Sequence, residues 1–184
     1  MKKVIMITGH LAALKSTIAS QLGSDLEILV FSKDKIKEVL GDSIGFKNRE
    51  ENLKLSEATY KLIVSLMKQT LQVNHEVIVE SNFRDYEVEE IKAYCQENQY
   101  QLIVIFLTGD PKVLYQRYLD RQPLRHIVHR STGTISYEIF ESSMKPFDPL
   151  LYGFEAKIID TSIYTQRDYQ DLLSYLKNVF NINK

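Results

Sequence analysis

The chain has 184 residues, 44% of them hydrophobic, which suits one globular domain with a full core. Its 23 lysines and arginines balance 24 aspartates and glutamates, so net charge gives no reason to expect nucleic acid or an anionic membrane as a partner. The longest apolar runs, such as residues 102–107, are far shorter than the roughly 20 residues that span a bilayer, and the first residues lack the apolar core of a signal peptide. We therefore expect a cytoplasmic protein.

Short apolar runs alternate with longer periodic segments, a pattern typical of an α/β fold with a parallel sheet and helices on both faces. Five strands are predicted, at residues 3–7, 27–31, 76–80, 101–107 and 157–160. Helices are predicted at residues 15–22, 33–40, 50–73, 86–98, 111–121, 136–145 and 166–180. The sequence has no internal repeat, low-complexity tract or linker, which favours a single domain over residues 1–184.

The first predicted strand runs directly into a loop typical of phosphate binding. The predicted nucleotide-binding residues are Gly9, His10, Leu11, Ala12, Ala13, Leu14, Lys15, Ser16 and Thr17. Gly9 permits a sharp turn, and Lys15 with Ser16 opens a helix whose free N–H groups face the loop. In such a loop the lysine reaches the β- and γ-phosphates and the serine hydroxyl binds Mg²⁺, while the ring of His10 could add a donor. An ordinary strand-turn-helix junction is the alternative.

Leu14 departs from the phosphate-loop pattern G-x-x-x-x-G-K-[ST], because it stands where the pattern has its second glycine. Glycine there lets the backbone approach phosphate and adopt left-handed torsion angles, which cost a branched residue roughly 1 to 2 kcal/mol. That cost equals about one decade in affinity. Leu14 is therefore predicted to weaken the site without abolishing it.

Acidic residues stand where the second and third predicted strands end. Glu80 follows an apolar run, so its carboxylate should emerge at the carboxyl edge of the sheet, beside the first loop, where it could bind Mg²⁺. Asp34 could accept or orient the proton of an attacking hydroxyl. The alternatives are a solvated strand end at Glu80, and a helix start capped by Ser32 with Asp34 in its first turn.

A basic segment begins within the fifth predicted helix. Arg117 and Arg121 are four residues apart, so both guanidinium groups lie on one helix face and suit bidentate phosphate binding. Arg125 and Arg130 extend the cluster into a loop, although a solvated basic face remains the alternative.

Two further loops stand out. His126 and His129 invite a metal interpretation, which we reject because neighbouring arginines would repel a cation and suitably spaced ligands are missing from the sequence. Residues 41–49 carry two glycines and little periodicity, and are predicted to form a mobile loop over the site.

Together these motifs resemble the small P-loop kinases. The chain is similar to a group of predicted kinases related to gluconate and shikimate kinases, chloramphenicol phosphotransferase and zeta toxins, often labelled AAA-family ATPases. The likeness rests on residues 9–17, 30–36, 77–83, 106–111 and 158–161, which appear in the family's order. It implies a three-layer P-loop NTPase fold with a five-stranded parallel sheet, a short lid at about residues 121–135, and ATP with Mg²⁺ as cofactors.

The resemblance also implies roles for single residues. Asp34 matches the acidic residue that faces the acceptor hydroxyl, and Ser16 with Glu80 matches the Mg²⁺ site. With Lys15, the lid arginines Arg117, Arg121 and Arg125 would act in catalysis. Asp160 and Thr161 match the turn beside adenine, although a turn after a strand often uses these residue types for local hydrogen bonds.

These features predict an ATP-dependent phosphotransferase that acts on a small hydroxyl-bearing acceptor. The alternative, motivated by Leu14, is an ATP-binding protein of kinase fold with weak or no transfer activity, a sensor or interaction module. A third possibility is a toxin of the zeta type that phosphorylates an amino sugar nucleotide, although no sequence feature singles out that acceptor. The sequence leaves the acceptor, the choice between adenine and guanine, and the oligomeric state open.

Overall fold

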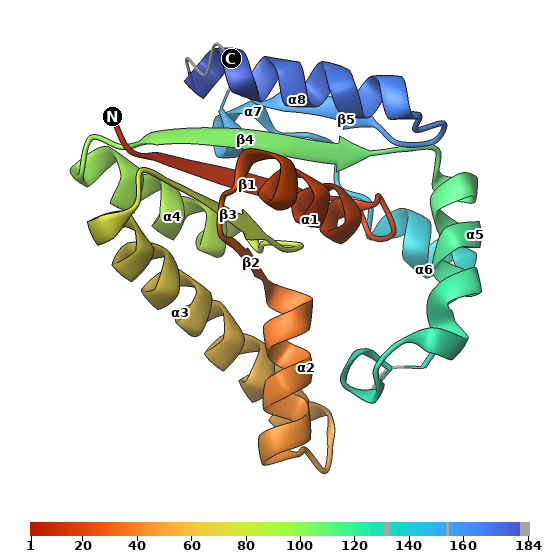
Figure 1. Cartoon of the computed structure of the whole chain (residues 1–184). Helices are drawn as coiled ribbons and strands as arrows, with labels where there is room; N and C mark the ends of the chain where they lie inside the picture. Colours follow the sequence, from red (N-terminus) through yellow and green to blue (C-terminus); the bar gives the residue numbers. More distant parts are fainter. Residues whose placement is uncertain (131–132, 154, 181–184) are drawn as a thin grey trace.

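The computed structural model describes residues 1–130, 133–153 and 155–180. Its five strands are β1 (Lys3–Gly9), β2 (Val30–Ser32), β3 (Glu76–Glu80), β4 (Gln101–Thr108) and β5 (Lys157–Asp160). They form one all-parallel sheet in the order β2-β3-β1-β4-β5 (Figure 1). Parallel strands need crossover connections, so the carboxyl ends of all five strands meet at one edge, which is where ligands bind in open α/β sheets.

Helices cover both faces of the sheet (Figure 1). They are α1 (Lys15–Leu26), α2 (Lys33–Ile44), α3 (Arg49–Val73), α4 (Asp85–Glu97), α5 (Pro111–Arg121), α6 (Tyr137–Ser142), α7 (Pro149–Tyr152) and α8 (Gln166–Phe180). Two short 3₁₀ turns, Gln122–Leu124 and Ile127–His129, follow α5 in the region predicted to be the lid. The predicted three-layer α/β architecture is confirmed.

The central strand β1 contributes side chains to two hydrophobic cores, one on each face of the sheet. Ile5 and Ile7 pack into the core beneath α1, α5 and α8, whereas Val4 and Met6 pack into the core beneath α3 and α4. All four side chains are fully buried. A strand buried on both faces must be apolar throughout, which is why β1 reads as a continuous hydrophobic run.

Two glycines that interrupt the helical pattern lie inside helices. α1 continues to Leu26, and the strand predicted at 27–31 is present but begins later than predicted, since β2 spans Val30–Ser32. Gly23 lies within α1, and a side chain at this position would clash because a Cβ atom there would come within 2.2 Å of the Val30 side chain. Likewise, Gly41 lies inside α2, where a Cβ atom would come within 3.1 Å of Val128.

The predicted loop at 41–49 was therefore too long, because α2 ends at Ile44 and α3 begins at Arg49. The helix predicted at 136–145 is shorter, since α6 spans Tyr137–Ser142, and α7 was not predicted. Cys95 is buried, and burial raises the pKa of its thiol to about 12. Within the described ranges, no helix combines the length and apolar character that crossing a membrane requires.

Candidate active site

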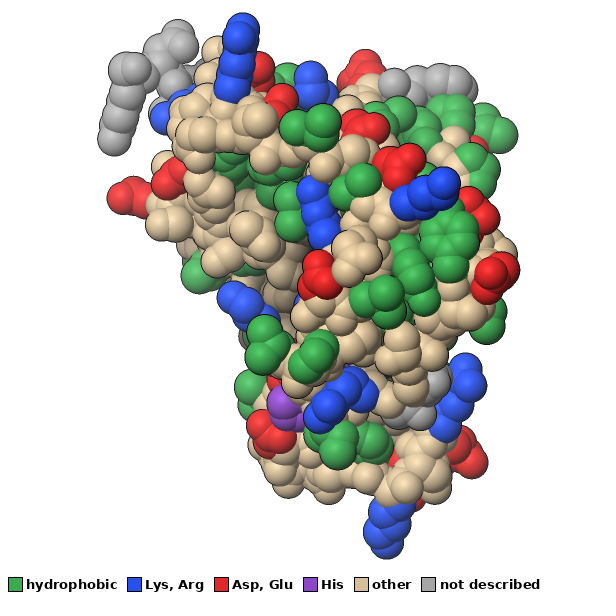
Figure 2. Space-filling view, turned by 90° about the vertical axis from the view of Figure 1, so that its right-hand side faces the viewer, with side chains coloured by type: hydrophobic (Ala, Val, Ile, Leu, Met, Phe, Trp, Pro, Cys, Tyr) green, Lys and Arg blue, Asp and Glu red, His purple; other side chains and the backbone are tan. Residues whose placement is uncertain are grey.

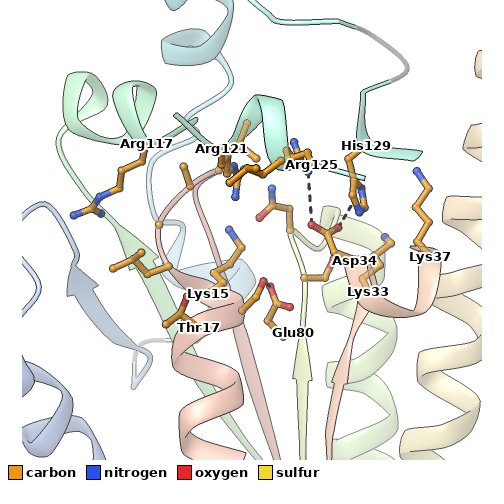
Figure 3. A pocket seen from close by; sticks show the side chains of 18 of the residues that line it. Lys15, Thr17, Lys33, Asp34, Lys37, Glu80, Arg117, Arg121, Arg125 and His129 are labelled. Carbon is orange, nitrogen blue, oxygen red and sulfur yellow. Dashed lines mark hydrogen bonds and ion pairs between the residues drawn. The ribbon is translucent and has the colours of Figure 1, made fainter. Parts of the chain in front are cut away.

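A cavity of about 630 Å³ opens at the carboxyl edge of the sheet, between the phosphate loop, α2 and α5 (Figure 3). Among its lining residues are the predicted site residues Leu11, Ala12, Ala13, Leu14, Lys15, Ser16, Thr17, Asp34, Glu80, Arg117, Arg121 and Arg125. Its described lining carries seven basic and three acidic side chains, an excess that suits a polyanionic ligand. On the outer face in Figure 2, by contrast, acidic, basic and hydrophobic side chains are interspersed.

The phosphate loop has the backbone that the motif requires. Gly9 has φ 122°, and a Cβ atom there would lie 2.0 Å from the carbonyl oxygen of Leu107. Ala12 and Leu14 are also left-handed, with φ of 63° and 60°. Leu14 thus adopts the conformation for which the motif uses glycine, and its partly buried side chain packs against the core.

Lys15 lies at the centre of the loop. Its ammonium group donates a hydrogen bond to the carbonyl oxygen of His10, and the residue is only 8% exposed. Burial lowers the pKa of Lys15 to about 8, and the nearby carboxylate of Glu80 partly opposes that shift. A desolvated ammonium that forms no ion pair with any residue the structure describes is suited to binding an anion that enters the loop.

Glu80 connects the ends of β2, β3 and α1. It is 4% exposed, and it accepts hydrogen bonds from the hydroxyls of Ser32 at 2.6 Å and Ser16 at 3.2 Å. Burial raises the pKa of the Glu80 carboxyl, while the Ser32 hydrogen bond and Lys15 oppose the shift. Ser32 makes no side-chain cap on α2, so its hydroxyl serves the carboxylate and not the helix.

Asp34 lies in the first turn of α2 and faces the lid, as Figure 3 shows. Its carboxylate oxygens lie 3.7 Å from Nη2 of Arg125 and 3.8 Å from Nδ1 of His129. The other ring nitrogen of His129 lies 2.9 Å from Glu38. Burial lowers the pKa of His129, with Asp34 acting in the opposite direction. Asp34 is therefore a half-exposed carboxylate held between two lid side chains.

Arg117 and Arg121 project from α5 into the same cavity (Figure 3). Nη2 of Arg117 donates to the carbonyl oxygen of Ser162 at 3.1 Å. Nη1 of Arg117 and Nε of Arg121 are buried and have no hydrogen-bond partner within the described part of the chain. Burial, together with the charge of Arg125, lowers the pKa of Arg121. Buried guanidinium donors without partners are aimed at a site for an anion.

Four predicted nucleotide-binding residues lie outside this cavity. Gly9 and His10 line a second cavity, where the His10 ring bonds to the carbonyl oxygen of Lys145 at 2.7 Å and to the Thr108 hydroxyl at 3.0 Å. The ring is therefore not available as a phosphate donor. Asp160 accepts hydrogen bonds from Ser162, and the hydroxyl of Thr161 donates to Thr108. Their turn contacts the cavity residue Arg117, which donates a hydrogen bond to Ser162.

Several cavity residues escaped the sequence analysis. Lys33 and Lys37 lie four residues apart in α2 and line the cavity (Figure 3). Nζ of Lys33 lies 2.8 Å from Glu87, whereas Nζ of Lys37 donates to Oδ1 of Asn52 at 2.6 Å. Their spacing on one helix face was the available signal. Throughout the described ranges, the structure contains no cluster of three or more histidine, cysteine, aspartate or glutamate side chains that could hold a metal ion.

A parallel sheet with a phosphate loop after its central strand, an acidic strand end and a basic lid defines the fold of the P-loop kinases. Solved structures agree. A candidate kinase from Chloroflexus aurantiacus j-10-fl is 28% identical, with a TM-score of 0.82 over 96% of this chain and 97% of that one. A shikimate kinase from Bacteroides thetaiotaomicron is 15% identical, with a TM-score of 0.59 over 97% and 98% of the two chains, and shows the fold alone.

Comparison of sequences assigns the chain to one family within the P-loop kinases. A shikimate kinase from Bacillus cereus (strain G9842) is 29% identical over 182 residues, which cover 98% of this chain and 99% of the relative. The sequence profile of the zeta toxin family matches residues 1–175. The chain therefore belongs to the zeta toxin family, and the predicted resemblance to this group of kinases is confirmed.

Proposed function

We propose that the protein is an ATP-dependent phosphotransferase that transfers a phosphoryl group to a hydroxyl of a small acceptor. The observation that carries the proposal is the convergence of Lys15, Asp34, Glu80 and Arg121 on one cavity from four separate elements. Phosphoryl transfer needs positioning and charge stabilisation more than covalent chemistry. A cavity with excess positive charge and one half-exposed carboxylate provides both.

The residues present fit ATP and Mg²⁺. Buried nitrogens of Arg117 and Arg121 have no hydrogen-bond partner among the described residues and, together with the ammonium of Lys15, match the negative charge of a triphosphate. Ser16 and Glu80 would hold Mg²⁺, an ion that usually keeps several waters and needs few protein ligands. When bound, the metal ion supplies charge neutralisation at the phosphate oxygens.

Asp34 is placed for the acceptor. It lies in the first turn of α2 and lines the cavity, and its carboxylate can accept a hydrogen bond from an acceptor hydroxyl and receive its proton. Arg125 and His129 lie beside it and would orient it. The arginines on the α5 side are placed to stabilise charge that develops on the transferred group.

A nucleotide-binding protein with little transfer activity is the second candidate. The left-handed conformation of Leu14 supports it, because a branched side chain in that conformation is disfavoured in the loop that surrounds phosphate. Packing of the Leu14 side chain against the core opposes it, since this contact offsets part of the cost.

The test is an ATP-consumption screen over sugars, nucleosides and small alcohols, followed by variants assayed on the best acceptor. Asp34→Asn should lower the transfer rate by roughly 100-fold and leave the MgATP dissociation constant nearly unchanged. Asp120→Asn is the matched control, because Asp120 lines the same cavity but is exposed and bonded to Gln116. Equal losses in both variants, or none in Asp34→Asn, would remove Asp34 from the mechanism. Failure of calorimetry to detect nucleotide binding would contradict the proposal as a whole.

A further inference from the structure

The tip of the lid contacts both α2 and α3. Val128, within the 3₁₀ turn Ile127–His129, is only 1% exposed, although it belongs to a segment predicted to be a surface lid. Its side chain packs against Gly41 of α2, where a Cβ atom would come within 3.1 Å of Val128 Cγ2. Figure 1 shows the segment after α5 running across toward α2. The lid is thus docked on the acceptor side of the cavity.

Asn52 of α3 joins the three parts at this point. It is 4% exposed, its Oδ1 accepts a hydrogen bond from Nζ of Lys37 at 2.6 Å, and its Nδ2 donates to the carbonyl oxygen of Val128 at 2.9 Å. Lys37 can only donate and the carbonyl can only accept, so the amide fits in one orientation. One buried side chain therefore connects α2, α3 and the lid.

Histidine–carboxylate contacts flank this buried contact. His126 lies 2.9 Å from Asp42, and His129 lies 2.9 Å from Glu38. With Asp34, these carboxylates are spaced four residues apart along one face of α2. Partly exposed pairs of this kind contribute little individually, whereas a buried amide that loses one partner leaves a polar group unsatisfied. The Asn52 contact is therefore the one on which docking depends.

We propose that Asn52 is a positioning residue that holds residues 125–129 on α2 and α3, and thereby sets Arg125 and His129 beside Asp34. The lid then moves together with the acceptor side of the cavity and not as an independent flap. The catalytic consequence rests on the proposed function, whereas the docking of the lid does not. Asn52 itself does not line the cavity, so its effect is exerted through Val128 and Lys37.

The test is hydrogen exchange followed by mass spectrometry on the full chain. Asn52→Asp keeps an oxygen for Lys37 but cannot donate to Val128, and Asn52→Ala loses both bonds. In either variant, exchange should rise roughly tenfold at His129 and Arg130, whose amides donate to His126 and Ile127 within the docked turn.

Thr59→Ala is the matched control. Thr59 is fully buried two turns further along α3, and its hydroxyl donates to the carbonyl oxygen of Leu55 in the same helix. It should lower stability without a selective rise in exchange at the lid. An unchanged lid in both Asn52 variants, or an equal rise in Thr59→Ala, would overturn the proposal.

Activity provides the second readout. In Asn52→Asp, the MgATP dissociation constant should stay within about twofold of that of the unaltered chain, while the transfer rate to the acceptor found in the screen falls roughly tenfold. A weakened MgATP affinity with an unchanged transfer rate would contradict positioning on the acceptor side. If the chain binds no nucleotide, the proposed function fails, but the exchange result still decides whether Asn52 docks the lid.

Discussion

The hydroxyl of Ser32, at the end of β2, donates a 2.6 Å hydrogen bond to Oε2 of Glu80, at the end of β3. The other carboxylate oxygen accepts from Ser16, in the first turn of α1. A single buried carboxylate thus fixes the relative positions of the second strand, the third strand and the phosphate loop. Burial of Glu80 lowers the free energy of unfolding, because the two hydroxyl hydrogen bonds only partly replace the water that the carboxylate loses.

Replacing Glu80 by Gln should stabilise the protein and weaken its response to Mg²⁺. Burial raises the pKa of Glu80, so the folded state holds its proton to higher pH than the unfolded state does. The free energy of unfolding of the unaltered chain therefore falls as pH rises above the pKa that Glu80 has in the unfolded state. At pH 7 the variant should be more stable by about 1 kcal/mol, and the difference should shrink toward pH 4.

Urea unfolding at the two pH values measures the stability difference, and calorimetry with and without Mg²⁺ measures the response to the metal. Glu76→Gln is the matched control, since Glu76 begins the same strand at the opposite edge of the sheet and pairs with Lys3 at 3.8 Å. A Glu80→Gln variant that keeps the full Mg²⁺ dependence of nucleotide binding would remove Glu80 from the metal site.

Replacing Lys15 by Met should separate stability from binding. Burial lowers the pKa of Lys15 to about 8, against about 10.4 in an unfolded chain. Between these values the unfolded state binds more protons, so stability of the unaltered chain rises with pH across the window. The variant should be more stable at pH 7, by roughly 1 to 3 kcal/mol, and should lose this advantage near pH 10.5.

The same variant should bind MgATP at least about tenfold more weakly, since a charge-assisted contact with phosphate is lost. Lys112→Met, at an exposed position on α5 outside the cavity, should change neither property. Unchanged calorimetric binding in Lys15→Met would show that the phosphate loop does not hold the nucleotide.

Leu14 offers a test of backbone strain within the loop. Leu14→Gly removes the left-handed penalty of about 1 kcal/mol and should tighten nucleotide binding by up to about fivefold, if that strain opposes the bound geometry. Leu14→Ala keeps the penalty, because alanine also carries a Cβ atom, and should bring no gain. Isothermal calorimetry with MgATP compares the three chains. Equal effects of glycine and alanine would attribute the change to the leucine side chain and not to the backbone.

Sequence pattern predicted the parts of the molecule whose physics is local. The alternation of apolar strands and periodic helices predicted the parallel sheet, and the spacing from Gly9 to Lys15 predicted the loop, whose left-handed Leu14 the structure contains. The sequence pattern predicted helix ends wrongly where a glycine is required by packing against a distant segment. Gly23 and Gly41 indicate helix ends, yet each is small because a side chain from another segment packs against it.

The candidate site divides in the same way. The positions of Asp34 and Glu80 after parallel strands could be predicted, because the carboxyl ends of such strands share one edge. The outward turn of the His10 ring toward Lys145 could not, since the partner lies 135 residues away. Neither could the bond from Asn52 to Val128, which joins residues 76 positions apart. Such contacts depend on how helices and loops pack after the sheet has formed, so only the tertiary structure decided where the lid rests and which side of the cavity it serves.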